Sequence, residues 1–190
     1  MTSERGLWVT LERNLGPYGA LKRIECTGAI GTPDVCYCLG GVTGWIELKE
    51  EDHWPKRSGT PITVRSLKLE QVCWLEDWAK LPGGRAFLLL QIVRTYMLLP
   101  ATIVRPLFER RLNRVELIGS AVATGEGRFP TRAMYDSLTT RHLPEGNATG
   151  YGAGDNVCRS PSSHVKPASA VPSSGSTKRG SRSTDDWITG

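Results

Sequence analysis

The spacing of apolar residues predicts two amphipathic helices. In the first, apolar residues recur at helical intervals after a plausible N-cap, Ser3, until Gly16 and Pro17 break the pattern. These residues are Leu7, Trp8, Leu11 and Leu15. The second helix is predicted from Ser66 to about Lys80, where the apolar period continues up to a Leu-Pro-Gly-Gly stop.

Shorter apolar runs predict five strands. They read ALKRIEC (20–26), DVCYCL (34–39), WIELK (45–49), RAFLLLQIV (85–93) and TYMLLP (95–100). The segment GGVTG predicts a tight turn that joins the second and third strands into a hairpin, and the fourth strand is apolar enough to be buried on both faces. The order of helix, three strands, helix and two strands predicts an α/β fold, with a central mixed sheet flanked by helices.

The pattern changes beyond Pro100. TIVRPLFERRLNRVELI is helical on either side of Pro106, and TRAMYDSLTTRHL indicates a further helix. From about Pro144 the chain consists mostly of Ser, Gly, Thr, Pro and Ala, too polar to bury a strand or helix. We therefore expect a folded domain over 1–143 and a disordered tail over 144–190, whose basic STKRGSRS segment adds attraction for phosphates.

The charge of the chain favours a polyanionic partner. Its formal net charge is +5 and its isoelectric point is near 9.1. The longest apolar run, AFLLLQIV, is too short to cross a bilayer, and acidic residues interrupt the N-terminal apolar pattern, unlike a signal peptide. We therefore expect no membrane association. Five cysteines make no even disulfide framework, so we expect a reducing, cytoplasmic setting.

Two carboxylates in the predicted hairpin are candidates for a metal site. Cross-strand neighbours lie about 5 Å apart, so Asp34 and Glu47 can share one cation if the strand register is right. Two such oxygen donors suit Mg²⁺, or Mn²⁺ in its place, with phosphate oxygens in the open positions. Lys49 projects from the same face as Glu47. Leu48 points to the core, and its carbonyl is a further candidate ligand.

These residues carry a resemblance to the PD-(D/E)XK nuclease superfamily. The order Pro33, Asp34, then Glu47, Leu48 and Lys49 matches its motif, and the segment from Leu7 to Leu99 resembles phage-encoded endonucleases related to Holliday junction resolvases and to the VRR-NUC branch. The resemblance implies a restriction-endonuclease-like core and Mg²⁺-dependent cleavage of DNA phosphodiester bonds, with branched or junction DNA as a candidate substrate.

The resemblance also assigns roles to single residues. It makes Asp34 and Glu47 metal ligands and Lys49 the catalytic lysine, and Gln71 matches a glutamine that resolvase-like relatives place on the helix after the hairpin. It leaves open which further acid completes the metal site. The candidates are Glu4, Glu25 and, ranked below these two, Glu12.

Basic and aromatic residues outside the hairpin are candidates for DNA contacts. They are Arg23, Trp54, Lys56, Arg57, Arg65 and Lys68. Three other tryptophans, Trp45, Trp74 and Trp78, are expected to pack in the core. Two rival functions remain open: a catalytically inactive DNA-binding module of the same fold, and a structural virion protein. A junction-cleaving enzyme makes two paired nicks, which suggests a homodimer.

Cysteines raise an alternative to the magnesium site. Cys26, Cys36, Cys38 and Cys73 could join His53 around zinc, but a Cys-x-Cys pair within one strand lacks the usual zinc-knuckle geometry. The favoured interpretation is that these four are buried free thiols.

Overall fold

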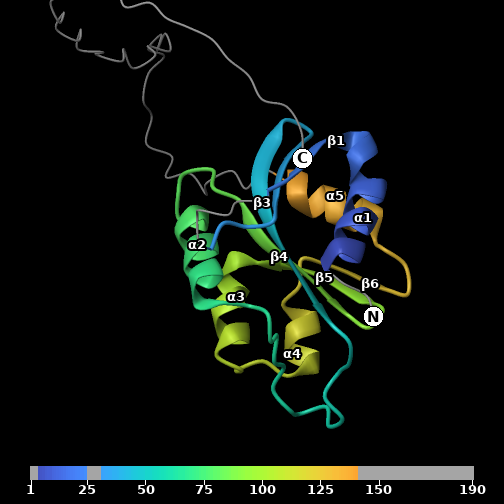
Figure 1. The fold of residues 1–190 in the computed structure, drawn as a ribbon, viewed down its shortest axis with the longest axis vertical. Coiled ribbons are helices and arrows are strands. Elements are labelled where there is room, and N and C mark those ends of the chain that lie inside the picture. Colours follow the sequence, from blue (N-terminus) through green and yellow to red (C-terminus); the bar gives the residue numbers. More distant parts are fainter. Residues whose placement is uncertain (1–3, 25–30, 141–190) are drawn as a thin grey trace, which may run out of the picture. The chain divides into compact units, whose positions relative to one another are not determined.

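Six strands form one mixed sheet in the computed structural model, which describes residues 4–24 and 31–140 (Figure 1). The strands are β1 (Gly19–Arg23), β2 (Val35–Leu39), β3 (Val42–Glu51), β4 (Ala86–Ile92), β5 (Thr95–Pro100) and β6 (Ala123–Glu126). They lie side by side in chain order, and every neighbouring pair is antiparallel except β3 and β4. The predicted α/β class with a central mixed sheet is confirmed.

Helices cover both faces of the sheet. They are α1 (Glu4–Leu15), α2 (Leu69–Ala79), α3 (Ala101–Phe108), α4 (Arg114–Gly119) and α5 (Thr131–Thr139), with one 3₁₀ turn at Gly16–Tyr18. Figure 1 shows α1 and α5 on one side of the sheet and α2 and α3 on the other. Leu7, Leu11 and Leu15 bury the apolar stripe of α1 in one core, and Val72 and Leu75 of α2 belong to the second. Strand β4 lies between the two cores and is buried along its whole length, as predicted.

Several element boundaries differ from the prediction. The hairpin turn is only Gly40–Gly41, both with positive φ, so the Val-Thr-Gly that follows belongs to β3. Helix α2 begins at Leu69 rather than Ser66. Pro106 lies inside helix α3 and does not separate two helical segments. Strand β6 was not predicted. The proposed Ser3 cap, the end of the first strand and the tail lie outside the described residues.

The β4–β5 turn holds a strained valine. Val93 has φ 58°, a left-handed conformation that is costly for a β-branched residue, and its N–H donates to the Glu51 carbonyl at 3.0 Å. Its side chain is 44% exposed, so little packing is lost on removing it. We expect Val93→Gly to raise the free energy of unfolding by about 1 kcal/mol.

Urea denaturation measures this effect, and a second exposed valine serves as the control. Val115 is 73% exposed but lies in helix α4, so Val115→Gly is expected to lower stability. A loss of stability in both variants would contradict the idea that Val93 is strained.

The helices of the structure can be compared with the length that a membrane span requires. Within the part of the chain that the structure describes, no helix combines the length and apolar character needed to cross a bilayer.

Candidate functional site

The candidate site lies where strands β2 and β3 part. Their pairing ends at Val35 and Ile46, whereas β3 continues to Glu51 with β4 as its partner. Asp34 directly precedes β2, so one more step in the register places it beside Glu47. Its Oδ2 accepts a hydrogen bond from the Leu48 N–H at 2.9 Å. The structure thus brings the two predicted carboxylates to the same end of the hairpin.

The alternation of β3 separates the acid and base from the leucine between them. Leu48 is buried in the core that α1 covers, whereas Glu47 and Lys49 lie on the opposite face. Glu47 has no exposed surface and Lys49 is only 3% exposed. The Lys49 Nζ lies 2.6 Å from the Glu47 Oε1. This pair is therefore held out of water.

Helix α2 supplies Gln71 to the same carboxylate. The Gln71 Nε2 donates to the Glu47 Oε1, and its Oε1 accepts from the Lys68 backbone N–H at 3.0 Å. Gln71 thus caps the first turn of its own helix while it holds Glu47. A bidentate pair between Arg105 of α3 and Glu76, at 2.7 and 2.5 Å, fixes the far end of α2.

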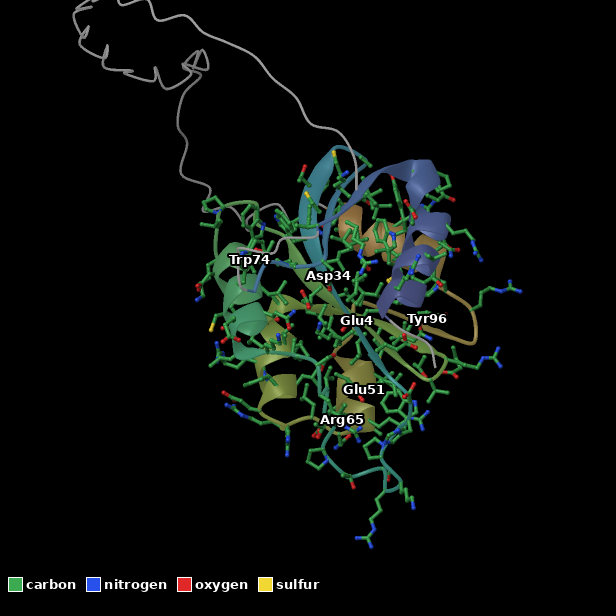
Figure 2. All side chains as sticks on the ribbon, viewed as in Figure 1. Glu4, Asp34, Glu51, Arg65, Trp74 and Tyr96 are labelled. Atoms are coloured by element: carbon green, nitrogen blue, oxygen red, sulfur yellow. The ribbon has the colours of Figure 1, made fainter. Side chains whose placement is uncertain are left out.

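Of the candidates for the further acid, Glu4 is the one that the described residues bring to the site. Its Oε1 lies 3.1 Å from the Lys49 Nζ and accepts from the Ser66 Oγ at 3.3 Å. Figure 2 labels Glu4, at the start of α1, and Asp34, just before β2, near the middle of the view. Glu12 is exposed two turns further along α1, and Glu25 lies outside the described residues. Sequence reasoning missed Ser66, because only the path of the loop brings it to Glu4.

Burial and a second carboxylate change the acidity of Glu47. Burial, followed by the charge of Asp34, raises the pKa of Glu47 to about 8, and Lys49 only partly offsets this. Burial disfavours the charged form of Lys49, but Glu47 and Glu4 outweigh it and raise the pKa of the lysine. Below pH 8 we take the proton to reside on Glu47, with Lys49 charged beside Glu4. Above pH 8 Glu47 and Lys49 form an ion pair.

The donor set fits a hard divalent cation. The Glu47 Oε2 is buried and has no hydrogen-bond partner among the described residues. Across residues 4–24 and 31–140, no three His, Cys, Asp or Glu side chains gather into a full ligand cage. Magnesium commonly takes one or two carboxylates and completes its shell with water and phosphate oxygens. Asp34, the free Glu47 oxygen and the Leu48 carbonyl are therefore a sufficient candidate set.

The predicted DNA contacts fall in two places. Lys56, Arg57, Arg65 and Lys68 are exposed on the segment between β3 and α2. Figure 2 marks Arg65 near Glu51, whose carboxylate accepts from the Arg65 backbone N–H at 2.6 Å. Arg23 ends β1, on the other side of the site. A role in DNA binding remains a prediction for all of them.

Trp54 has a structural contact that its sequence position did not suggest. The Arg114 guanidinium lies 4.5 Å from the centre of its ring, and the ring packs against the core under α2 and α3. Trp45, Trp74 and Trp78 contact one another, with Trp74 and Trp78 stacked at 5.2 Å. Trp74 and Trp78 pack partly buried against the core under α2 and α3, as expected, whereas Trp45 is half-buried and contacts these two rings.

The cysteines depart from the prediction of buried thiols. Cys36 and Cys38 lie on the same face of β2, but Cys36 is half-buried and Cys38 is exposed. Cys73 is also half-buried. The buried positions of β2 are Val35, Tyr37 and Leu39, so Cys36 and Cys38 lie on the less buried face of the strand. Cys26 lies outside the described residues.

Comparisons with known proteins give a likeness in structure but none in sequence. No protein-family model matches the chain, and no curated protein matches it in sequence. Among solved structures, the chain is similar to Hjc, a Holliday junction resolvase of Archaeoglobus fulgidus, with 24% sequence identity. The match covers 53% of this chain and 75% of Hjc, with a TM-score of 0.37. A likeness of this extent establishes neither family nor function, which must be argued from the site itself.

Proposed function

We propose that this chain is a metal-dependent endonuclease of the PD-(D/E)XK type that hydrolyses DNA phosphodiester bonds. One observation carries the proposal: a buried lysine and a buried glutamate meet a second carboxylate where two strands part, and one glutamate oxygen has no partner. Buried charges are costly and are seldom kept without a use. The net charge of +5 suits a polyanionic substrate.

Each residue of the site has a distinct task in this proposal. Asp34 and Glu47 hold the cation together with the Leu48 carbonyl, and Gln71 keeps the Glu47 carboxylate in place. Lys49 orients the attacking water and stabilises the charge that develops on the phosphate. Glu4 keeps Lys49 charged and positioned. When bound, Mg²⁺ would supply a water of lowered pKa and neutralise phosphate charge.

Cleavage assays with and without metal test the proposal. Linear duplex, single-stranded and four-way-junction DNA are incubated with the full chain in Mg²⁺ or in EDTA. We expect cleavage of at least one substrate in Mg²⁺, loss of cleavage in EDTA, and loss in Asp34→Asn. Asp136→Asn is the matched control, because Asp136 is exposed on α5 and pairs only with Arg132 among the described residues.

The substrate panel also separates the rival functions. Preference for the junction would support a resolvase-like enzyme acting in recombination, and phage genome processing would be one setting for it. Binding without cleavage in any metal condition would favour an inactive DNA-binding module. Cleavage that survives both EDTA and Asp34→Asn would place the reaction elsewhere in the chain.

A further inference from the structure

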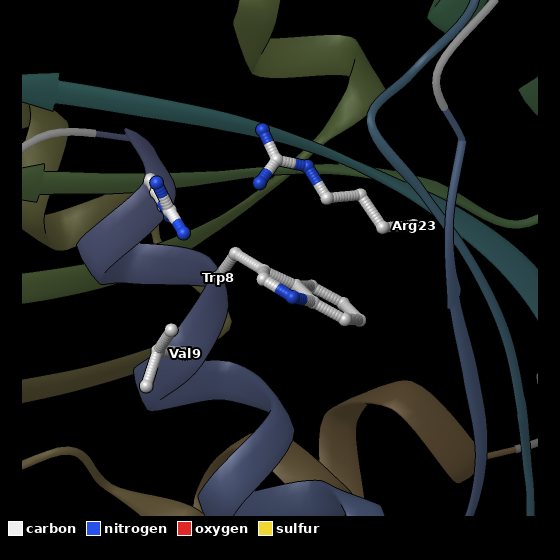
Figure 3. A pocket seen from close by; sticks show the side chains of 4 residues that line it. Trp8, Val9 and Arg23 are labelled. Carbon is white, nitrogen blue, oxygen red and sulfur yellow. The ribbon is translucent and has the colours of Figure 1, made fainter.

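We infer that a pocket between α1 and β1 binds an unpaired nucleotide of the DNA strand, with its base stacked on Trp8. This inference rests on the proposed nuclease function and names a structural feature of its substrate. The pocket is lined by Arg5, Trp8, Val9 and Arg23 and has a volume of about 680 Å³ (Figure 3). That volume lies in the range of roughly 300–1,000 Å³ that is common for small-ligand sites.

The side chains of the pocket suit a nucleotide. Trp8 packs against the core beside α1 while it lines the pocket, so its ring is a fixed surface on which a base can stack. Figure 3 shows the Arg23 side chain extending from β1 toward α1, above Trp8 in the view. Arg5 adds a second guanidinium, and among the described residues neither arginine has a carboxylate within salt-bridge distance. Two such cations favour a phosphate.

The two elements that line the pocket, α1 and β1, also contact the candidate site. Glu4 and Trp8 are four residues apart on α1 and therefore share one face of the helix, about 6 Å apart along its axis. On the other wall, Arg23 is followed by Ile24, whose N–H donates to the Asp34 carbonyl at 2.8 Å. A DNA strand bound at the candidate site thus has its neighbouring nucleotide within reach of Trp8.

Stacking on Trp8 favours an unpaired rather than a paired base. A base that stacks on Trp8 must leave its own helical stack, which costs least at a frayed, mismatched or single-stranded position. Val9 is 43% exposed at the rim and offers the sugar or base an apolar contact. The expected substrate is therefore a duplex with an unpaired nucleotide next to the cleaved bond.

Binding in EDTA tests the inference separately from catalysis. The probes are fluorescent duplexes with a short single-stranded end of either polarity, in which the unpaired position next to the duplex carries a base or is abasic. A blunt duplex is the reference, and anisotropy gives the affinities. We expect the base-bearing probe of the preferred polarity to bind about tenfold more tightly than its abasic twin.

Variants assign that preference to the pocket. Trp8→Ala should reduce it to less than about twofold, while Trp8→Phe should keep most of it because phenylalanine still stacks. Arg5→Gln and Arg23→Gln should lower the affinity for both the base-bearing and the abasic probe. Arg13→Gln is the matched control, since Arg13 is exposed in the last turn of the same helix. Thermal melting checks that the Trp8 variants are folded.

The outcomes separate this inference from the proposed function. Equal affinity of the unaltered protein for base-bearing and abasic probes of both polarities would overturn the inference, even if the enzyme cleaves DNA. A base preference that persists in Trp8→Ala would also overturn it. A base preference that Trp8→Ala removes would support the pocket even if no cleavage is found. A deoxynucleoside monophosphate that displaces the probe would show that the pocket also accepts a free nucleotide.

Discussion

Replacing Lys49 with methionine is expected to lower the rate of DNA cleavage by about 10²–10⁴-fold, the usual effect of removing one group that stabilises transition-state charge or moves a proton. Methionine keeps the length and apolar stem of lysine and removes only the ammonium. That group lies 2.6 Å from the Glu47 Oε1 and is shielded from water, so in the proposed reaction its charge would act on a phosphate with little screening by solvent. Single-turnover cleavage in Mg²⁺ measures the effect.

The fold of the Lys49→Met variant should tolerate the change near neutral pH. Removing one member of a buried ion pair can cost about 3–5 kcal/mol when the other charge remains. Here the pKa of Glu47 is already raised to about 8, so the carboxyl takes up a proton instead of remaining as an unpaired anion. Lys80→Met is the control, because Lys80 is exposed at the end of α2. Cleavage at the unaltered rate by Lys49→Met would exclude Lys49 from the reaction.

The metal-free protein is expected to lose stability as pH rises from about 5 to about 8, and Glu47→Gln to remove much of that loss. The ordinary pKa of the glutamate is 4.5, and burial followed by the charge of Asp34 raises it to about 8 in the fold. Between these values the unfolded chain releases a proton that the folded chain keeps. Stability therefore falls with rising pH, by up to about 1.4 kcal/mol per pH unit and by a few kcal/mol over the window.

Lys49 does not mask this effect. Its pKa is raised above 10.5 in the fold, so the stability that it contributes is present below that pH and is lost only above it. Urea unfolding in EDTA across the pH range gives the slope for each protein. Glu70→Gln, which changes an exposed glutamate in the first turn of α2, should keep the slope of the unaltered chain. An identical slope in Glu47→Gln would mean that Glu47 is ionised throughout.

The fold was predictable where one spacing rule governs a long segment. The leucines of α1 and the apolar run of β4 are buried as their patterns indicate. Strand β6 has four residues, Ala-Thr-Gly-Glu, two of them exposed, so its pairing with β5 determines its structure more than its own sequence does. Helix α3 tolerates Pro106 because its apolar residues, Val104 and Leu107, are buried against the sheet.

The site was partly predictable for the same reason. Alternation along β3 is enough to place Glu47 and Lys49 on one face, with Leu48 on the other. The choice of Glu4 over Glu12 rests on the contact of Glu4 with Lys49 at 3.1 Å, which depends on how α1 packs on the sheet and not on the helical pattern. The contact between Ser66 and Glu4 spans 62 positions in the chain, and no local pattern indicates it.

The parallel pairing of β3 and β4 determines at which stage of folding the candidate site is assembled. The hairpins β2–β3 and β4–β5 have two-residue turns and can each form from local contacts. Parallel strands instead need the long crossover through α2, whose closure carries a larger entropic cost. Glu47 lies on β3 and Gln71 lies within that crossover, so a chain with only its hairpins formed has not assembled the candidate site. If the proposed activity is found, it will report the completed sheet, whereas strand content alone will not.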